Sequence, residues 1–199
     1  MSGILEFYSV SWSEIRASIG SRNRKLYRAI LKQFEPEFES LYDPSSFGSG
    51  PDFSEGLERW IEGELGGGGG PPVEPAPGDA LGLVLLIKHH GQCIGSLQHS
   101  EAAGTKFEER FVRDAAVKAL QPLFPLELLL SRPLFGVEQE DLPLWGGLTR
   151  EELASIAPKL SQDAPTDESD LDIDAWMADL WNCLGSAVDL GTDLITLYV

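Results

Sequence analysis

The two ends of the chain constrain its fold more than any other feature. Residues 4–10 read I-L-E-F-Y-S-V and residues 194–199 read L-I-T-L-Y-V. Both segments are rich in β-branched and aromatic residues, which predicts a strand at each end. A single strand cannot satisfy its own backbone hydrogen-bonding groups. We therefore expect the terminal strands to pair with each other in one small sheet.

Most of the sequence between these strands has helical patterning. Two capping boxes, Ser11 to Glu14 and Thr149 to Glu152, each predict the start of a helix. Ser21 is the expected cap of a third. The expected helices cover about 12–18, 22–34, 54–65, 79–90, 105–121, 150–160 and 173–188. Residues 79–90 also fit a buried strand, residues 123–132 fit either a short helix or an extended segment, and residues 136–147 fit a loop. The predicted fold class is α+β, mainly helical, with about six or seven helices packed on a small sheet of N- and C-terminal strands.

A length of 199 residues allows a single domain spanning 1–199. Five consecutive glycines, Gly66 to Gly70, precede a proline-rich stretch that ends at Pro77. Glycine makes a chain flexible and proline stiffens it, so we expect a flexible insertion at about 66–78. The sequence on either side of this insertion is too short for an independent core.

Charge is the most unusual property of the chain. There are 15 Lys and Arg against 32 Asp and Glu, a net charge of −17. Such a surplus disfavours nucleic acids and anionic membranes as partners. The basic residues of the second helix are Arg22, Arg24, Lys25, Arg28 and Lys32. We expect them to be solvated or to face acidic parts of the same chain, with an anion site as the alternative.

The acidic residues concentrate toward the C-terminus. Between Asp163 and Asp179 there are seven acidic residues and no basic one. The candidate partner-binding surface consists of Asp163, Asp167, Glu168, Asp170, Asp172 and Asp174. This surface predicts a non-enzymatic protein, of accessory or toxin-neutralising type, that docks to a basic protein and binds more slowly as salt rises. A subunit of a larger assembly is an alternative, and the sequence leaves the oligomeric state open.

A second alternative is a metal-binding or hydrolytic enzyme. His89, His90, Cys93 and His99 lie within eleven residues, the densest group of nitrogen and sulfur ligands in the chain. Zinc sites need ligands whose spacing makes them converge. Here Gly91 interrupts the helix and His99 falls on an expected loop, so we favour imidazoles that interact with the carbonyls at a helix C-terminus. We assign no catalytic residue and expect neither cofactor nor metal.

The cysteine content and the absence of a targeting signal suggest a cytoplasmic protein. Glu6 interrupts the only early apolar stretch, so no secretory signal is expected. The apolar run 81–87 is too short to span a bilayer. Cys93 and Cys183 form no CxxC pair and are expected to be reduced thiols, although one long-range disulfide is the alternative.

Three segments together resemble a bacterial family of proteins of unknown function. The first is Tyr8-Ser9-Val10 followed by Trp12, Ile15, Gly20 and Ser21. The second runs from Leu128-Leu129-Leu130 to Gly147-Leu148-Thr149 and Glu152-Leu153, and the third is Asp193 to Tyr198 after a long helix. The resemblance is limited to the two ends of the chain. It implies a bacterial cytoplasmic protein and brings no activity or catalytic residue.

Overall fold

The computed structural model describes residues 3–41, 52–66, 75–99, 127–137, 143–160 and 171–198. Within the chain, contacts separate into two compact units. Unit 1 comprises Met1–Val10, Gln92–Arg132 and Leu144–Val199, and unit 2 comprises Ser11–Gly91 and Pro133–Pro143. The expected loop at 43–51, the expected helix at 105–121, most of the 66–78 segment and the 161–170 segment lie outside the described residues.

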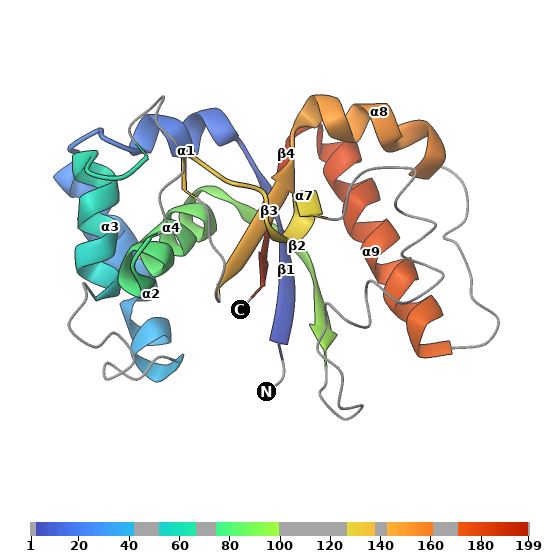
Figure 1. Ribbon diagram of the computed structural model, residues 1–199, viewed down its shortest axis with the longest axis horizontal. Coiled ribbons are helices and arrows are strands. Elements are labelled where there is room, and N and C mark those ends of the chain that lie inside the picture. Colours follow the sequence, from blue (N-terminus) through green and yellow to red (C-terminus); the bar gives the residue numbers. More distant parts are fainter. Residues whose placement is uncertain are drawn as a thin grey trace. The chain divides into compact units, whose positions relative to one another are not determined.

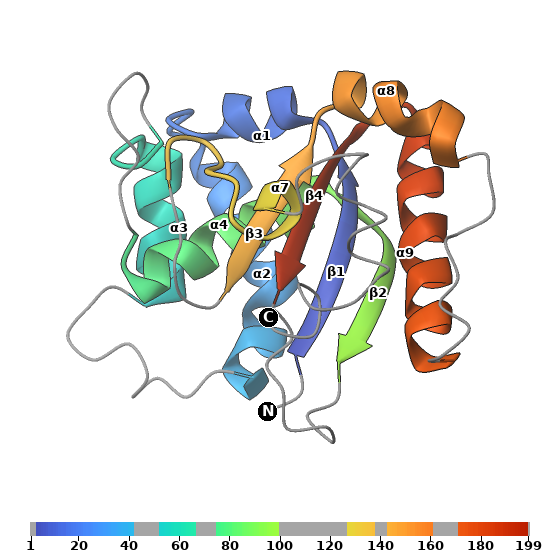
Figure 2. The same cartoon turned by 45° about the vertical axis from the view of Figure 1, so that its right-hand side comes forward.

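A four-stranded antiparallel sheet forms the centre of unit 1. Its strands are β1 (Gly3–Val10), β2 (Gln92–His99), β3 (Leu144–Leu148) and β4 (Asp193–Tyr198), in the order β2-β1-β4-β3 (Figures 1 and 2). The pairing of β1 with β4 runs from Leu5 opposite Tyr198 to Val10 opposite Asp193. This confirms the prediction that the first and last strands pair, and the fold is α+β and mainly helical.

Strand β3 corrects the prediction that residues 136–147 form a loop, and β2, which contains His99, was not predicted. The pattern of β2 is irregular because a bulge at Ile94 breaks the period of two: Phe7 pairs with Gly95 and Tyr8 pairs with Cys93. Both strands also contain glycine, which weakens a strand prediction. Here the glycines allow close packing. A Cβ on Gly146 would lie 2.3 Å from the carbonyl oxygen of Leu128.

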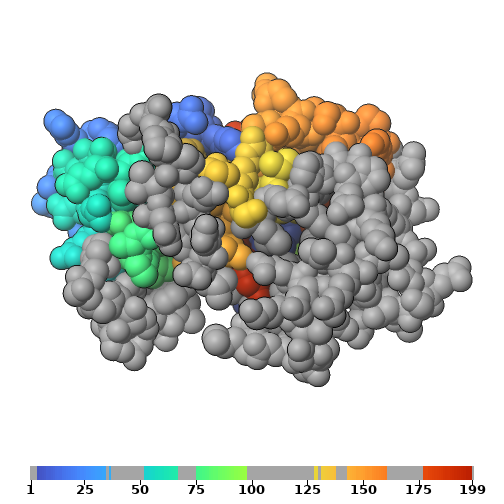
Figure 3. All heavy atoms as spheres, in the orientation of Figure 1, coloured from blue at the N-terminus to red at the C-terminus, as the bar shows by residue number. Residues whose placement is uncertain are grey.

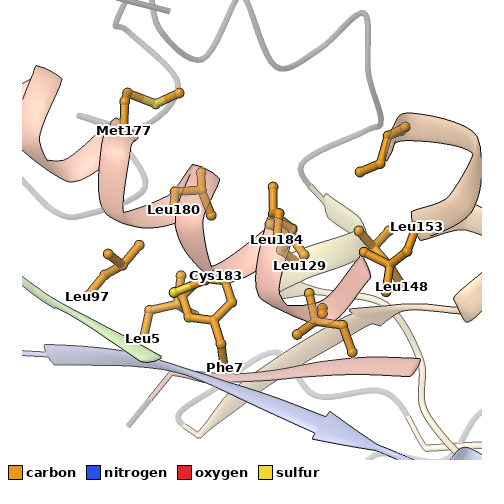
Figure 4. Close-up of a cluster of buried hydrophobic side chains, with 13 residues drawn as sticks. Leu5, Phe7, Leu97, Leu129, Leu148, Leu153, Met177, Leu180, Cys183 and Leu184 are labelled. Carbon is orange, nitrogen blue, oxygen red and sulfur yellow. The ribbon is translucent and has the colours of Figure 1, made fainter. Parts of the chain in front are cut away.

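Three helices pack with this sheet in unit 1: α7 (Glu127–Leu130), α8 (Arg150–Leu160) and α9 (Leu171–Leu190). α7 shows that part of the ambiguous segment 123–132 is helical. Figure 4 shows the shared core, in which Met177, Leu180, Cys183 and Leu184 of α9 face Leu5, Phe7 and Leu97 of the sheet. Burial, with smaller contributions from Asp179 and Cys93, raises the pKa of Cys183 to about 11. Both cysteines are free thiols.

Unit 2 contains α1 (Trp12–Ser18), α2 (Arg24–Leu41), α3 (Phe53–Glu62) and α4 (Pro77–His90). The predicted cap of α1 is present, since Ser11 Oγ accepts the amide of Glu14. The predicted cap of α2 is wrong. Asn23 Oδ1, rather than Ser21, accepts the amides of Lys25 and Leu26 at 3.1 and 3.2 Å. None of the described helices has the length and apolar character that crossing a bilayer requires.

α4 is a helix, so the alternative of a buried strand is wrong. It begins at Pro77 rather than after Asp79, because proline is well suited to the first helical turn. Every residue from Gly78 to Ile87 is buried. A helix that is buried on all sides has no polar face, which explains why the sequence pattern could not distinguish it from a strand.

α3 and α4 cross with their backbones in direct contact. A Cβ on Gly56 would lie 2.0 Å from the carbonyl oxygen of Gly78, and one on Gly82 would lie 2.4 Å from the amide nitrogen of Leu57. Polar contacts at Asp79 secure the crossing. Trp60 Nε1 donates to the Asp79 carbonyl at 2.7 Å, and Arg59 Nη1 lies 2.7 Å from both carboxylate oxygens of Asp79. Burial raises the pKa of this carboxyl, and Arg59 opposes that rise.

The contact between Gly95 and Cys183 gives a direct test of packing in unit 1. A Cβ on Gly95 would lie 2.4 Å from Cys183 Sγ but 3.9 Å from Cys183 Cβ. We expect Gly95→Ala to lower the free energy of unfolding by about 1–3 kcal/mol through overpacking. Adding Cys183→Ala removes the clashing sulfur and is expected to restore most of this loss in a urea-unfolding double-mutant cycle. A double variant no more stable than Gly95→Ala alone would refute the packing.

Candidate functional site

The structure describes only part of the predicted acidic surface. Asp163, Asp167, Glu168 and Asp170 lie outside the described residues. Asp172 and Asp174 lie near the start of α9, whose side chains are described from Met177 onward. The described part of the acidic surface is therefore the remainder of α9.

The solvent side of α9 is acidic and has no neutralising cation on the same helix. Asp179, Asn182 and Asp189 are exposed, whereas Leu180, Cys183 and Leu184 face the core. Within the described residues, no ion pair involves Asp179 or Asp189. The sequence of α9 contains no lysine or arginine. We call Asp179, Asn182 and Asp189 the acidic face of α9.

A cavity of about 370 Å³ lies in unit 1, between α8 and the C-terminal end of α9. Its lining consists of Arg150, Glu151, Leu153, Ala154, Ala187, Val188, Gly191 and Thr192. Leu153, Ala154, Ala187 and Val188 make the greater part of it apolar. The outer surface of α8, which supplies one wall, is visible in Figure 3.

The predicted capping box at Thr149 holds the α8 side of this cavity. Glu152 N donates to Thr149 Oγ1 at 3.2 Å, and Thr149 N donates to Glu152 Oε2 at 2.7 Å. Arg132 Nη1 donates to the same carboxylate oxygen at 2.7 Å and to the carbonyl of Gly147 at 3.0 Å. Although burial acts in the opposite direction, the bonds from Arg132 and Thr149 lower the pKa of Glu152. The start of α8 is therefore fixed to β3 and to the segment that follows α7.

The α9 side is fixed by the turn into β4. Gly191, at a φ of +64°, ends the helix, and its amide donates to the Val188 carbonyl at 3.0 Å. Thr192 Oγ1 lies 2.6 Å from Ser9 Oγ on β1. Asp193 Oδ1 accepts the amide of Arg150 at 2.9 Å, so it connects this turn to the start of α8. Both walls are thus positioned by the sheet.

Charged groups and one exposed apolar residue surround the cavity. The side chains of Arg150 and Glu151 are 66% and 78% exposed and form a long ion pair of 3.9 Å. Leu190, next to the lining residue Gly191, is 49% exposed, the most exposed large apolar side chain among the described residues. The Thr192 hydroxyl is engaged by Ser9, which leaves no activated nucleophile in the lining. The arrangement suits binding of an apolar side chain.

Sequence reasoning did not find this cavity. Its walls come from Arg150 to Ala154 and from Ala187 to Thr192, which are more than thirty residues apart in the chain. The two local signals, the capping box at Thr149 and the stop at Gly191, mark the element ends that border it. Neither indicates that the two ends are adjacent.

The predicted histidine and cysteine group is divided between the units. His89 and His90 end α4 in unit 2, whereas Cys93 and His99 belong to β2 in unit 1. The prediction that His99 lies on a loop is wrong. In the part of the chain that the structure describes, no group of three or more His, Cys, Asp or Glu residues is arranged to hold a metal ion.

His90 instead contacts Ser18, a partner 72 residues earlier in the chain. Ser18 Oγ lies 2.8 Å from His90 Nε2 and donates to the Glu14 carbonyl at 3.1 Å. A hydroxyl has one proton to donate, so His90 Nε2–H must be the donor to Ser18. A serine activated as a nucleophile needs the opposite polarity. We interpret this half-buried pair as a link between α1 and α4.

His89 extends this group. Its ring lies 5.1 Å from that of His90 in an edge-to-face arrangement, and its Nδ1 is 2.9 Å from Gln33 Oε1 of α2. Burial lowers the pKa of both histidines, and in His90 the repulsion from His89 adds to the effect while Glu14 opposes it. Both rings at this helix end are therefore harder to protonate than a free imidazole.

The comparisons with known proteins identify a family but no activity. A family model described as a domain of unknown function, DUF7691, matches residues 1–199, so the chain belongs to that family. The match covers the whole chain, not only the two ends that carry the resemblance noted from the sequence. No curated protein and no solved structure matches the chain.

The histidine pair predicts loss of stability in mild acid. Because the folded-state pKa values lie below the ordinary value of 6.5, the unfolded chain binds protons first as the pH falls. Stability is therefore lost as the pH falls from about 7 through the folded pKa values. We expect urea unfolding of His89→Gln/His90→Gln to show a smaller loss than the native chain between pH 7.5 and 5. His99→Gln, which alters the remaining histidine, is the control. Identical pH profiles for the native chain and the double variant would contradict this account.

Proposed function

We propose that the protein is a non-enzymatic binding protein that docks to a basic protein segment through the acidic face of α9 and the adjacent cavity. The observation that carries this proposal is that an apolar cavity and an unneutralised acidic face share one helix. Ala187 and Val188 line the cavity, while Asp179 and Asp189 of the same helix are exposed.

The proposed partner has two chemical features. An apolar side chain fills the cavity, whose volume of about 370 Å³ accommodates one large side chain. Buried apolar anchors of this kind supply most of the binding energy at protein interfaces. A lysine or arginine residue beside the anchor pairs with Asp189, which follows the lining residue Val188, and Asp179 earlier on the helix adds to the attraction of basic partners. Exposed charge pairs add little energy but accelerate association and give selectivity for basic partners.

The end of α9 adds to the attraction. The C-terminus of a helix carries a partial negative charge, which cations stabilise. The last turn of α9 has no basic residue and contains Asp189 instead. The negative end of a 20-residue helix and a carboxylate therefore act together beside the cavity. The predicted surface at Asp163 to Asp174 extends the negative charge of this helix in sequence.

The cellular role and the compartment expected from the sequence are part of the proposal. We propose an accessory role in which the protein neutralises or escorts a basic partner, in the cytoplasm of a bacterium. The exposed free thiol of Cys93 supports a reducing compartment.

The proposal can be tested with designed peptides. The probe is a labelled lysine-rich helical peptide with one central leucine, compared with the same peptide carrying alanine at that position. We expect fluorescence anisotropy to show tighter binding of the leucine peptide and an affinity that falls as salt rises. A leucine peptide that does not bind at low salt, or that binds no better than the alanine peptide, would refute the proposal.

Matched variants assign the site. Ala154→Leu fills the cavity while keeping a good helix former, and is expected to weaken the leucine peptide about ten-fold. Ala178→Leu makes the same change on an exposed residue of α9 outside the lining, and is expected to have little effect. Asp179→Asn/Asp189→Asn is expected to weaken both peptides several-fold, and Glu55→Gln/Glu64→Gln is the control with the same charge change in unit 2. Equal effects from site and control variants would remove the assignment.

A further inference from the structure

One face of α2 and the turn before it carry four basic side chains. Lys25, Arg28 and Lys32 are spaced by three and four residues, which places them along one side of the helix, and Arg22 lies in the turn before it. All four are exposed. The opposite side of α2 carries Ile30 and Phe34, which are buried. We call the four residues the basic face of α2.

The basic face is not neutralised within the described structure. Arg24 differs from its neighbours because it forms ion pairs with Glu58 and Glu62 of α3. None of the four residues of the basic face forms an ion pair with any described residue. The expected pairing of these cations with acidic parts of the same chain is therefore seen at Arg24 alone in the described regions.

Helix stability does not account for these cations. The positive end of the dipole at a helix N-terminus favours acidic residues in the first turn. The first turn of α2 has no acidic residue and begins with Arg24 and Lys25. The Asn23 cap compensates by accepting the amides of Lys25 and Leu26. Two cations thus occupy positions where they disfavour the helix, although acidic residues outnumber basic ones by 32 to 15 in this chain.

We propose that the basic face of α2 is a second docking surface, which binds an acidic segment of a partner protein. Charge complementarity selects the partner. The three cations on the helix, Lys25 to Lys32, extend over about 10 Å at the rise of 1.5 Å per residue, which matches a short segment whose carboxylates repeat every three or four residues. This surface lies in unit 2 and has the opposite sign to the acidic face of α9, so the proposal is independent of the function proposed above.

A nucleic acid fits the surface less well. A net charge of −17 repels anionic partners in general, and it repels a long phosphate backbone more than a short segment with a few carboxylates. Single-stranded nucleic acids also need exposed aromatic side chains on which bases stack. Within the described residues, every aromatic side chain is buried or half-buried. A short acidic segment carries fewer charges and needs no aromatic surface for stacking.

The test uses a fluorescein-labelled peptide with four glutamates at i, i+3, i+6 and i+10 and a DNA 12-mer. Anisotropy of the full-length protein at 50 mM salt is expected to show binding of the peptide and weaker binding of DNA. Lys25→Glu/Arg28→Glu/Lys32→Glu is expected to weaken peptide binding at least about ten-fold. The exposure of these side chains means the variant should fold, and circular dichroism checks this.

Two controls separate position from charge. Lys25→Arg/Arg28→Lys/Lys32→Arg keeps the charges and should bind like the native chain. Lys159→Glu reverses an exposed cation on α8 and should leave peptide binding within about two-fold. Failure to bind the peptide, tighter binding of DNA, or unchanged binding by the triple reversal would overturn the proposal. Self-association in sedimentation that the triple reversal abolishes would also overturn it, because the surface would then belong to a second copy.

Discussion

The hydrogen-bonded pairing of β1 with β4 is the interaction on which unit 1 depends. It places the last strand of the chain beside the first, and β2 and β3 then complete the sheet on either side. Because β4 begins at Asp193, α9 must end immediately before it, and Gly191 makes that turn at a φ of +64°. The Ser9–Thr192 contact and the bond from Arg150 N to Asp193 fix the same turn to β1 and α8. The cavity between α8 and α9 is therefore a consequence of where the terminal strands pair.

Unit 2 depends on a different constraint, the backbone contact of α3 with α4. Gly56 and Gly82 remove the side chains that would separate the two helices. Close approach then brings Arg59 and Trp60 within hydrogen-bonding distance of Asp79. A buried carboxylate without these partners would be costly, so the glycine contact and the polar contacts require each other. The C-terminal end of α4 is also held by side-chain hydrogen bonds within unit 2. His90 donates to Ser18, and His89 contacts Gln33.

Local features could be predicted from the sequence, and so could one distant contact, the pairing of the terminal strands, because each strand needs a hydrogen-bonding partner. The other contacts between distant residues could not. The terminal strands, the Thr149 capping box, the long helix and its stop at Gly191 all follow from neighbouring residues. β2 and β3 were missed because Gly95, Gly146 and the Ile94 bulge disrupt the strand pattern for reasons of packing that only the fold reveals. The cavity and the Ser18–His90 pair join segments far apart in the chain, and no local pattern encodes them. The histidine group appeared compact in sequence, but α4 ends at His90 and β2 begins at Gln92, so its members belong to different units.

Charge placement along the helices separates folding from binding. In α1, α3, α4 and α8 acidic residues occupy the first turn and basic residues the last, as the helix dipole favours. The last turns of α2 and α7 also lack a basic residue, but two helix ends depart from this rule beside an exposed charged surface. α2 begins with Arg24 and Lys25, and α9 ends with Asp189 and no cation. Each of these ends adjoins a row of exposed like charges that no described ion pair neutralises. Because these exposed charges disfavour the helix ends that carry them, partners that supply the missing counter-charge explain them better than the stability of the fold does.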